Sequence, residues 1–129
     1  MIVTNLFIGS RFPVNRKKLR ATVERVLTTQ GIVDAQVDVS VVGKRKITEL
    51  NEKRLNHPGE TDVLSFPQHE RHQLHDFPLP EGQAPHLGDV VISFPEAVNT
   101  AKRYGKLVDD QLCFYLEHGL MHLLGYHHD

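Results

Sequence analysis

The sequence is short of cysteine and lacks any long apolar run. Its 129 residues include a single cysteine, Cys113, which excludes an internal disulfide framework and a cysteine-only zinc site and fits a reducing cytoplasm. No apolar stretch reaches the roughly eighteen residues of a transmembrane helix, and residues 1–5 lack the features of a secretory signal. We therefore expect a cytoplasmic protein with no membrane partner, folded as one domain over residues 1–129.

A net excess of charge is also absent, because the formal net charge is −1 at pH 7 with histidine neutral. The balance is uneven along the chain, since residues 1–30 carry six basic side chains against Glu24 alone, whereas residues 61–129 are acidic. The basic cluster is expected to attract phosphates, although a solvated helix face explains it equally simply. The candidate phosphate-binding side chains are Arg16, Lys17, Lys18 and Arg20.

Apolar periodicity predicts an alternation of strands and helices. Val37, Val39 and Val41 alternate with polar residues, as in a strand with one buried face, whereas Leu19 and Val23 are spaced as on a helix. The predicted strands cover residues 2–8, 37–41, 62–66 and 88–94, and the predicted helices cover residues 15–30, 44–55, 95–104 and 108–124. Residues 67–87 are expected to form a long loop. This order predicts an α+β fold with a mixed four-stranded sheet packed with helices, in which the last two strands pair antiparallel.

Histidine, by contrast, is abundant, with nine in the chain. His118 and His122 are four residues apart on the last predicted helix, so both imidazoles lie on one face and can reach the same ion. Gly125 can end this helix in a left-handed conformation and turn the chain so that His128, or its competitor His127, approaches the same point. The glycine-turn spacing favours His128. Three neutral histidines with an open fourth position are typical of catalytic zinc, so we predict a metal site at the C-terminal helix and the following turn.

A metalloprotease-like hydrolase is one interpretation of this motif, because the spacing H-x-x-x-H-x-x-G-x-x-H equals that of the metzincins. In the protease motif a glutamate directly follows the first histidine, but Gly119 occupies that position here. Glu117 precedes His118 and lies about 100° around the helix from it, so Glu117 does not replace that base. Peptide hydrolysis by the standard route therefore lacks its general base.

Three segments together resemble the YbeY-type endoribonucleases, a family also known as rRNA maturation factors. The segment HGLMHLLGYHH, residues 118–128, resembles the family signature H-G-x-L-H-L-x-G-Y-D-H. Leu50 and Asn51 followed by TDVLSFP, residues 61–67, are similar to the family's L-N…T-D-V-L-S-F-P block. LGDVVI, residues 87–92, is similar to its L-G-D strand. The three blocks follow one another in the family's order across residues 50–128.

The resemblance implies an α+β fold with one zinc ion on His118, His122 and His128, and hydrolysis of single-stranded RNA. Sites of three histidines also accept nickel or another divalent metal. The resemblance further implies a role in rRNA maturation and ribosome quality control, with rRNA and the small ribosomal subunit as partners. A non-catalytic ribosome-associated module with a vestigial metal site is a competing interpretation.

The competing interpretation arises because the chain departs from the family pattern at an arginine that is thought to assist catalysis. Leu55 stands at that position, and Arg54 precedes it. A shift by one residue rotates a helical side chain by about 100°. We expect Arg54, or His57 in the following loop, to supply the contact to the RNA phosphate. Asp89 is expected to support a ligand histidine from a strand behind the helix.

Overall fold

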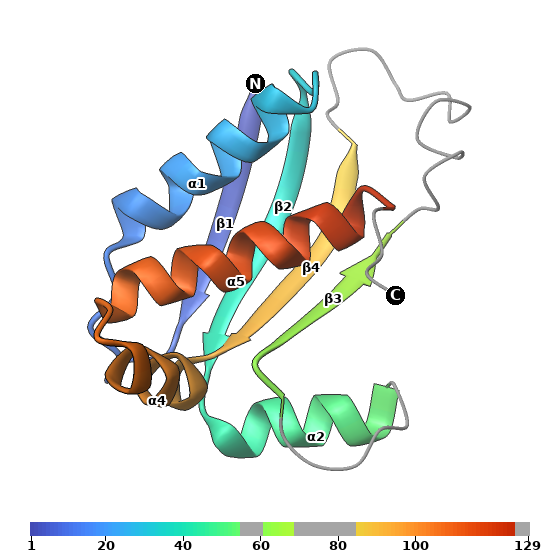
Figure 1. Ribbon diagram of the computed structural model, residues 1–129. Helices are drawn as coiled ribbons and strands as arrows, with labels where there is room; N and C mark the ends of the chain where they lie inside the picture. Colours follow the sequence, from blue (N-terminus) through green and yellow to red (C-terminus); the bar gives the residue numbers. More distant parts are fainter. Residues whose placement is uncertain (55–60, 69–84, 126–129) are drawn as a thin grey trace.

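The computed structural model describes residues 1–54, 61–68 and 85–125 (Figure 1). Within these residues the chain forms four strands and four helices, and every predicted element is present within a few residues of its expected bounds. In chain order the elements are β1 (Ile2–Ile8), α1 (Arg16–Thr29), β2 (Ala35–Val42), α2 (Lys44–Arg54), β3 (Val63–Pro67), β4 (His86–Ser93), α4 (Phe94–Tyr104) and α5 (Val108–Leu123). The predicted α+β class is thereby confirmed.

The four strands form a single mixed sheet in the order β1-β2-β4-β3. β1 pairs parallel with β2, and β2 pairs parallel with β4, whereas β3 runs antiparallel to β4 at the edge. Helix α1 supplies the crossover between the two parallel strands β1 and β2, as parallel pairing requires. The predicted antiparallel pairing of the last two strands is confirmed.

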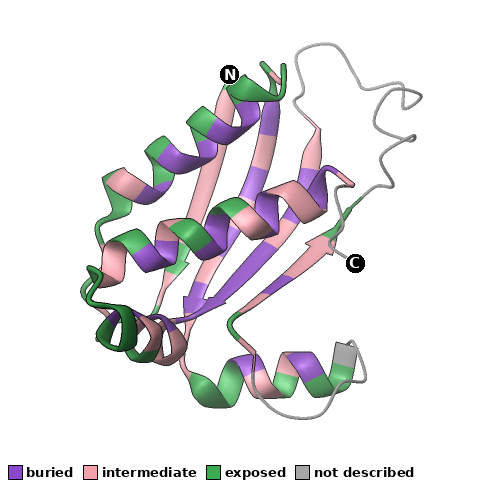
Figure 2. Cartoon of the chain, in the orientation of Figure 1, coloured by how far each residue is buried: buried purple, intermediate pink, exposed green. Residues whose placement is uncertain are grey.

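The main core lies between one face of the sheet and the helices α1 and α5, which cross that face side by side in Figure 1. β2 alternates strictly between buried and half-buried residues, and Val37, Val39 and Val41 point into this core. Leu116 and Leu120 of α5 are completely buried in this core. Figure 2 shows purple, buried segments repeating along α5. On the opposite face α2 packs Ile47 in a second, smaller cluster.

The predicted bounds of the loop over residues 67–87 are wrong at both ends. Pro67 belongs to β3, and β4 begins at His86, two residues before the predicted start. Proline is tolerated at the end of this edge strand, because an N–H there can face solvent instead of the neighbouring strand. Residues 69–84 lie outside the described part of the chain.

None of the helices in the described residues combines the length and the apolar character that crossing a bilayer requires.

Candidate metal centre

The two helical histidines of the predicted metal site lie on one flank of α5. Their ring centroids are 6.1 Å apart with an interplanar angle of 48°, as expected for residues one turn apart. Both side chains are half-buried, and the Nε2 atom of His122 lies inside the protein rather than in solvent. Gly125 has a φ of 92°, the left-handed conformation expected at the end of this helix. His128 lies outside the described residues, so the convergence of His118, His122 and His128 on one ion stays a prediction.

The position of this flank is set by close packing of α5 on the sheet. An ideal Cβ atom placed on Gly119 would lie 2.6 Å from Cγ1 of Val90 in β4 and 3.4 Å from Cγ2 of Val63 in β3. Real Cβ contacts do not become as short as 2.6 Å, so no side chain fits at position 119 without movement of the helix or the strand. Gly119 therefore allows α5 to lie against β4, with His118 beside the contact.

The same packing bears on the protease interpretation. A glutamate at position 119, where the metalloprotease motif has its general base, would point into Val90 and not toward the histidines. The neighbouring Glu117 is engaged elsewhere, since its Oε2 accepts a hydrogen bond of 3.0 Å from Nη2 of Arg25 in α1. This ion pair links α5 to α1, and the expectation that Glu117 does not act as the base stays a prediction.

An apolar wall borders His118 on the outer surface of α5. The ring of Phe114 meets the imidazole edge-on at a centroid distance of 5.4 Å. Phe114 and His118, together with Glu117 and Met121, line a hollow of about 250 Å³. Phe114 is 53% exposed. Nζ of Lys106 lies 5.8 Å from the centroid of the same ring.

A second group of metal-ligating side chains lies on the opposite face of the sheet, and sequence reasoning missed it. Asp38 of β2 and His86 and Asp89 of β4 place one ligand atom each within 4.8 Å of one another. This His/Asp/Asp cluster could hold a metal ion. The expectation that Asp89 supports a histidine of α5 is wrong, because the neighbouring Val90 is the residue that faces α5, and Asp89 joins Asp38 on the far side.

The expected phosphate contacts are only partly described. Arg54 is the last residue of α2, but its side chain and the whole of His57 lie outside the described part of the structure. Their predicted contact with RNA therefore stays a prediction.

Two basic side chains of α1, Lys18 and Arg16, have different surroundings. Nζ of Lys18 forms an ion pair with Asp110 of α5, and the hydrogen bond to Asp110 raises the pKa of Lys18 above its usual value. Arg16 instead lines an open hollow of about 800 Å³ with Lys46 of α2, between apolar residues of the ends of β1 and β2. Of these two α1 side chains, Arg16 is therefore the better placed for a phosphate.

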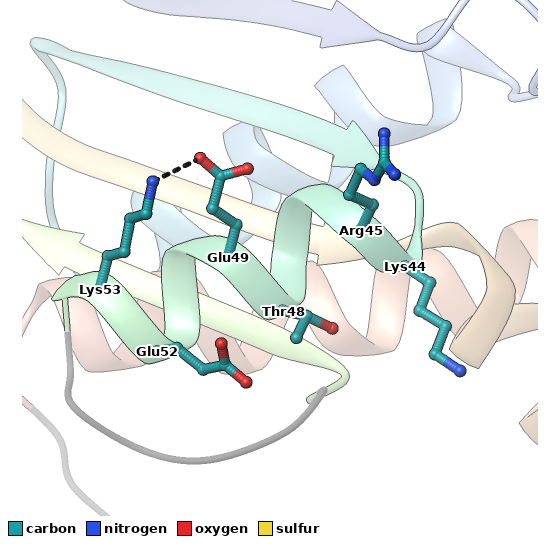
Figure 3. Close-up of a pocket in the computed structure, with 6 residues that line it drawn as sticks. All are labelled: Lys44, Arg45, Thr48, Glu49, Glu52 and Lys53. Carbon is teal, nitrogen blue, oxygen red and sulfur yellow. Dashed lines mark hydrogen bonds and ion pairs between the residues drawn. The ribbon is translucent and has the colours of Figure 1, made fainter.

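Helix α2 adds further positive charge near this hollow. Its first turn contains Lys44, Arg45 and Lys46 and no acidic residue, so cations lie at the positive end of the helix dipole, where anions are favoured. Figure 3 shows that Arg45, Glu49 and Lys53 extend along one side of the helix, and Lys44, Thr48 and Glu52 along the other. Nζ of Lys53 donates to Glu49 at 3.0 Å, and this hydrogen bond lowers the pKa of Glu49.

Comparison with known proteins identifies the relatives of this chain. The family model described as "Endoribonuclease YbeY" matches residues 9–129. An "Endoribonuclease YbeY" of Anaeromyxobacter sp. is 40% identical over 125 residues, which cover 95% of this chain and 60% of the relative. One of Symbiobacterium thermophilum is 38% identical over 113 residues, covering 85% of this chain and 71% of the relative. The chain thus spans between 60% and 71% of the length of these two curated relatives.

The fold also matches a solved structure. The solution structure of a protein from Thermotoga maritima superposes with a TM-score of 0.62 at 26% sequence identity. The match covers 100% of this chain and 75% of the other.

Proposed function

The chain belongs to the YbeY endoribonuclease family, and from this premise we propose that residues 1–129 act as one metal-dependent hydrolase domain that cleaves single-stranded RNA. The observation that carries the proposal is the position of His118 and His122 on one flank of α5, within the histidine motif of the family. The substrate would be rRNA during its maturation and in ribosome quality control, with the small ribosomal subunit as partner. A single cysteine fits action in a reducing cytoplasm.

We assign one zinc ion to His118, His122 and His128, with nickel or another divalent metal as a possible substitute. The donors fit this metal, because half-buried neutral imidazoles are typical zinc ligands and three of them leave a position open. Bound zinc would supply a water of lowered pKa and would polarise a phosphoryl oxygen. The remaining groups come from the chain itself.

The basic side chains near α2 would hold the RNA backbone. Arg16 and Lys46 line one hollow, and the first turn of α2 presents its amide dipole to the same region. Arg54 or His57 would then contact the scissile phosphate and stabilise the charge that develops there. Phe114, beside His118, would stack against a base next to the cleaved bond.

Two other functions remain as alternatives. Leu55 at the family's arginine position favours a non-catalytic ribosome-associated module that binds metal and RNA without cleavage. A metalloprotease-like hydrolase is disfavoured by the packing at Gly119, which leaves no room for the glutamate base.

The test is cleavage of a single-stranded RNA by the purified chain, with and without a chelator, and by the variant His122→Ala. We expect the chelator and the substitution to abolish cleavage, and His122→Ala to lower the metal content. Glu117→Gln is the matched control, because Glu117 lies on the same helix but pairs with Arg25, and it should keep both activity and metal. Unchanged metal content in His122→Ala would refute the assigned site. Zinc and RNA binding without any cleavage would favour the non-catalytic module.

A further inference from the structure

A row of polar side chains crosses the sheet on the face opposite α5. In the strand register Asn5 of β1 lies beside Asp38 of β2, and Asp38 lies beside Asp89 of β4. The adjacent valines of β2 are completely buried against the helices on the other face, so Asp38 lies on the polar, half-buried face of this strand. Nδ2 of Asn5 donates a hydrogen bond of 2.9 Å to Oδ1 of Asp38 and fixes the orientation of that carboxylate.

A β-bulge in β4 brings His86 to the same face. The register shifts there, because Gln36 pairs with His86 while the next residue, Val37, pairs with Gly88. In a regular strand, residues three positions apart such as His86 and Asp89 would lie on opposite faces, and the extra residue Leu87 brings them to the same face. Gly88 has a φ of 142°, which residues with a side chain rarely adopt, so the sequence permits the bulge at this position.

The resulting cluster places two carboxylates beside one imidazole. Two carboxylates directly opposite one another on neighbouring strands, Asp38 and Asp89, destabilise the pairing of those strands. Nε2 of His86 lies 3.3 Å from Oδ2 of Asp38, and both side chains are about 30% exposed, so solvent ions reach them. A bound cation would offset the repulsion between the two carboxylates.

The geometry fits a small divalent metal ion. In tetrahedral coordination with ligand distances of about 2.0–2.1 Å, neighbouring ligand atoms are roughly 3.4 Å apart. The 3.3 Å between Nε2 of His86 and Oδ2 of Asp38 already has this value, and all three ligand atoms lie within 4.8 Å of one another. Asp89 supplies the third of these ligand atoms, and three protein ligands would leave a position open for water.

We propose that Asp38, His86 and Asp89 bind a divalent transition-metal ion such as Zn²⁺, in a site separate from the histidines of α5. The sheet lies between the two sites, since Val90 faces Gly119 of α5 while Asp89 faces away. An ion here would join β2 to β4, the two central strands of the sheet, and would neutralise the facing carboxylates. Its role is structural, so it does not depend on RNA cleavage.

The proposal is tested by isothermal titration of the metal-free chain with Zn²⁺. We expect two bound equivalents for the natural chain and one for the double variant His118→Ala/His122→Ala. In that double background Asp38→Asn should weaken the remaining binding by about 100-fold or more, as expected when a metal site loses a well-oriented group. The matched control is Asp34→Asn in the same background, which makes the same change in charge just before β2 and should leave the equivalent in place.

Circular dichroism spectra first verify that each variant is folded. If Asp38→Asn does not fold, His86→Gln replaces it, because this variant removes a ligand without removing a carboxylate. The inference is overturned if the double variant binds no Zn²⁺, or if Asp38→Asn or its replacement binds Zn²⁺ as tightly as the Asp34→Asn control. RNA cleavage is not a readout of this experiment, so failure of the sheet site and failure of the endoribonuclease proposal are distinguishable.

Discussion

Replacement of Gly119 by alanine tests the contact that positions the histidine flank of α5. The added Cβ atom would lie 2.6 Å from Cγ1 and 3.2 Å from Cγ2 of Val90. Val90 is completely buried in β4, and as a β-branched residue it has little freedom to rotate away. Either the helix or the strand must therefore move to admit the methyl group.

Two effects of opposite sign determine the stability of Gly119→Ala. Alanine is favoured over glycine in a helix by up to about 1 kcal/mol. Overpacking of a well-filled core costs about 1–3 kcal/mol. Both methyl groups of the rigid Val90 side chain crowd the added Cβ atom. We therefore expect the packing cost to exceed the gain in helix propensity, with a net loss of about 1–2 kcal/mol in the free energy of unfolding.

The measurement is urea unfolding of a double-mutant cycle with Val90→Ala. Val90→Ala alone should cost about 2 kcal/mol through lost apolar burial and a cavity. In the double variant the alanine methyl at position 119 occupies part of that cavity, so the combined loss should be smaller than the sum by about 1–2 kcal/mol. The reasoning is refuted if Gly119→Ala is more stable than the natural chain, or if the two effects add within about 0.5 kcal/mol.

Three further predictions concern the RNA-binding side chains and a helix cap. Substitution of the true phosphate contact, Arg54→Ala or His57→Ala, should lower the RNA cleavage rate by about 10²–10³-fold at unchanged metal content; full activity in both variants would remove both residues from the mechanism. Charge reversal at Arg16 and Lys46 together should weaken binding of single-stranded RNA and lower the slope of log affinity against log salt by about 1–2; an unchanged slope would show that the hollow is only a solvated surface. Asn15→Ala should cost about 1 kcal/mol in urea unfolding, because the Asn15 side chain accepts a 3.0 Å hydrogen bond from the first turn of α1; a loss near zero would contradict the capping role.

The fold was predictable where periodicity alone decides the structure. The alternation of Val37, Val39 and Val41 identifies β2 because one face of that strand meets the core and the other does not. The start of β4 was not predictable in the same way. His86 and Leu87 join the sheet through a bulge, and a bulge depends on the pairing of two distant strands and leaves no period in the sequence.

The same distinction applies to the candidate sites. His118 and His122 are neighbours in the sequence at helical spacing, so their shared flank follows from the helix alone. Asp38, His86 and Asp89 come from two strands, and only the tertiary register brings them together. The available signal was Asp38 itself, a carboxylate between buried valines. Strand alternation around Asp89 would also have shown that this side chain and Val90 cannot face the same helix.

The strand order has a consequence for how the chain acquires its structure. The central pair β2 and β4 is separated in the sequence by α2 and β3, so the sheet is not completed by adding strands in the order of synthesis. Contacts between segments so far apart in the sequence form slowly. The conformational entropy of the intervening chain must be lost on loop closure before the strand pairing stabilises the structure. Helix α5 follows all four strands and packs on β3 and β4. Because α5 packs on β3 and β4, a metal ion bound to its histidine flank would favour the state in which these strands are paired, and would thereby stabilise the sheet.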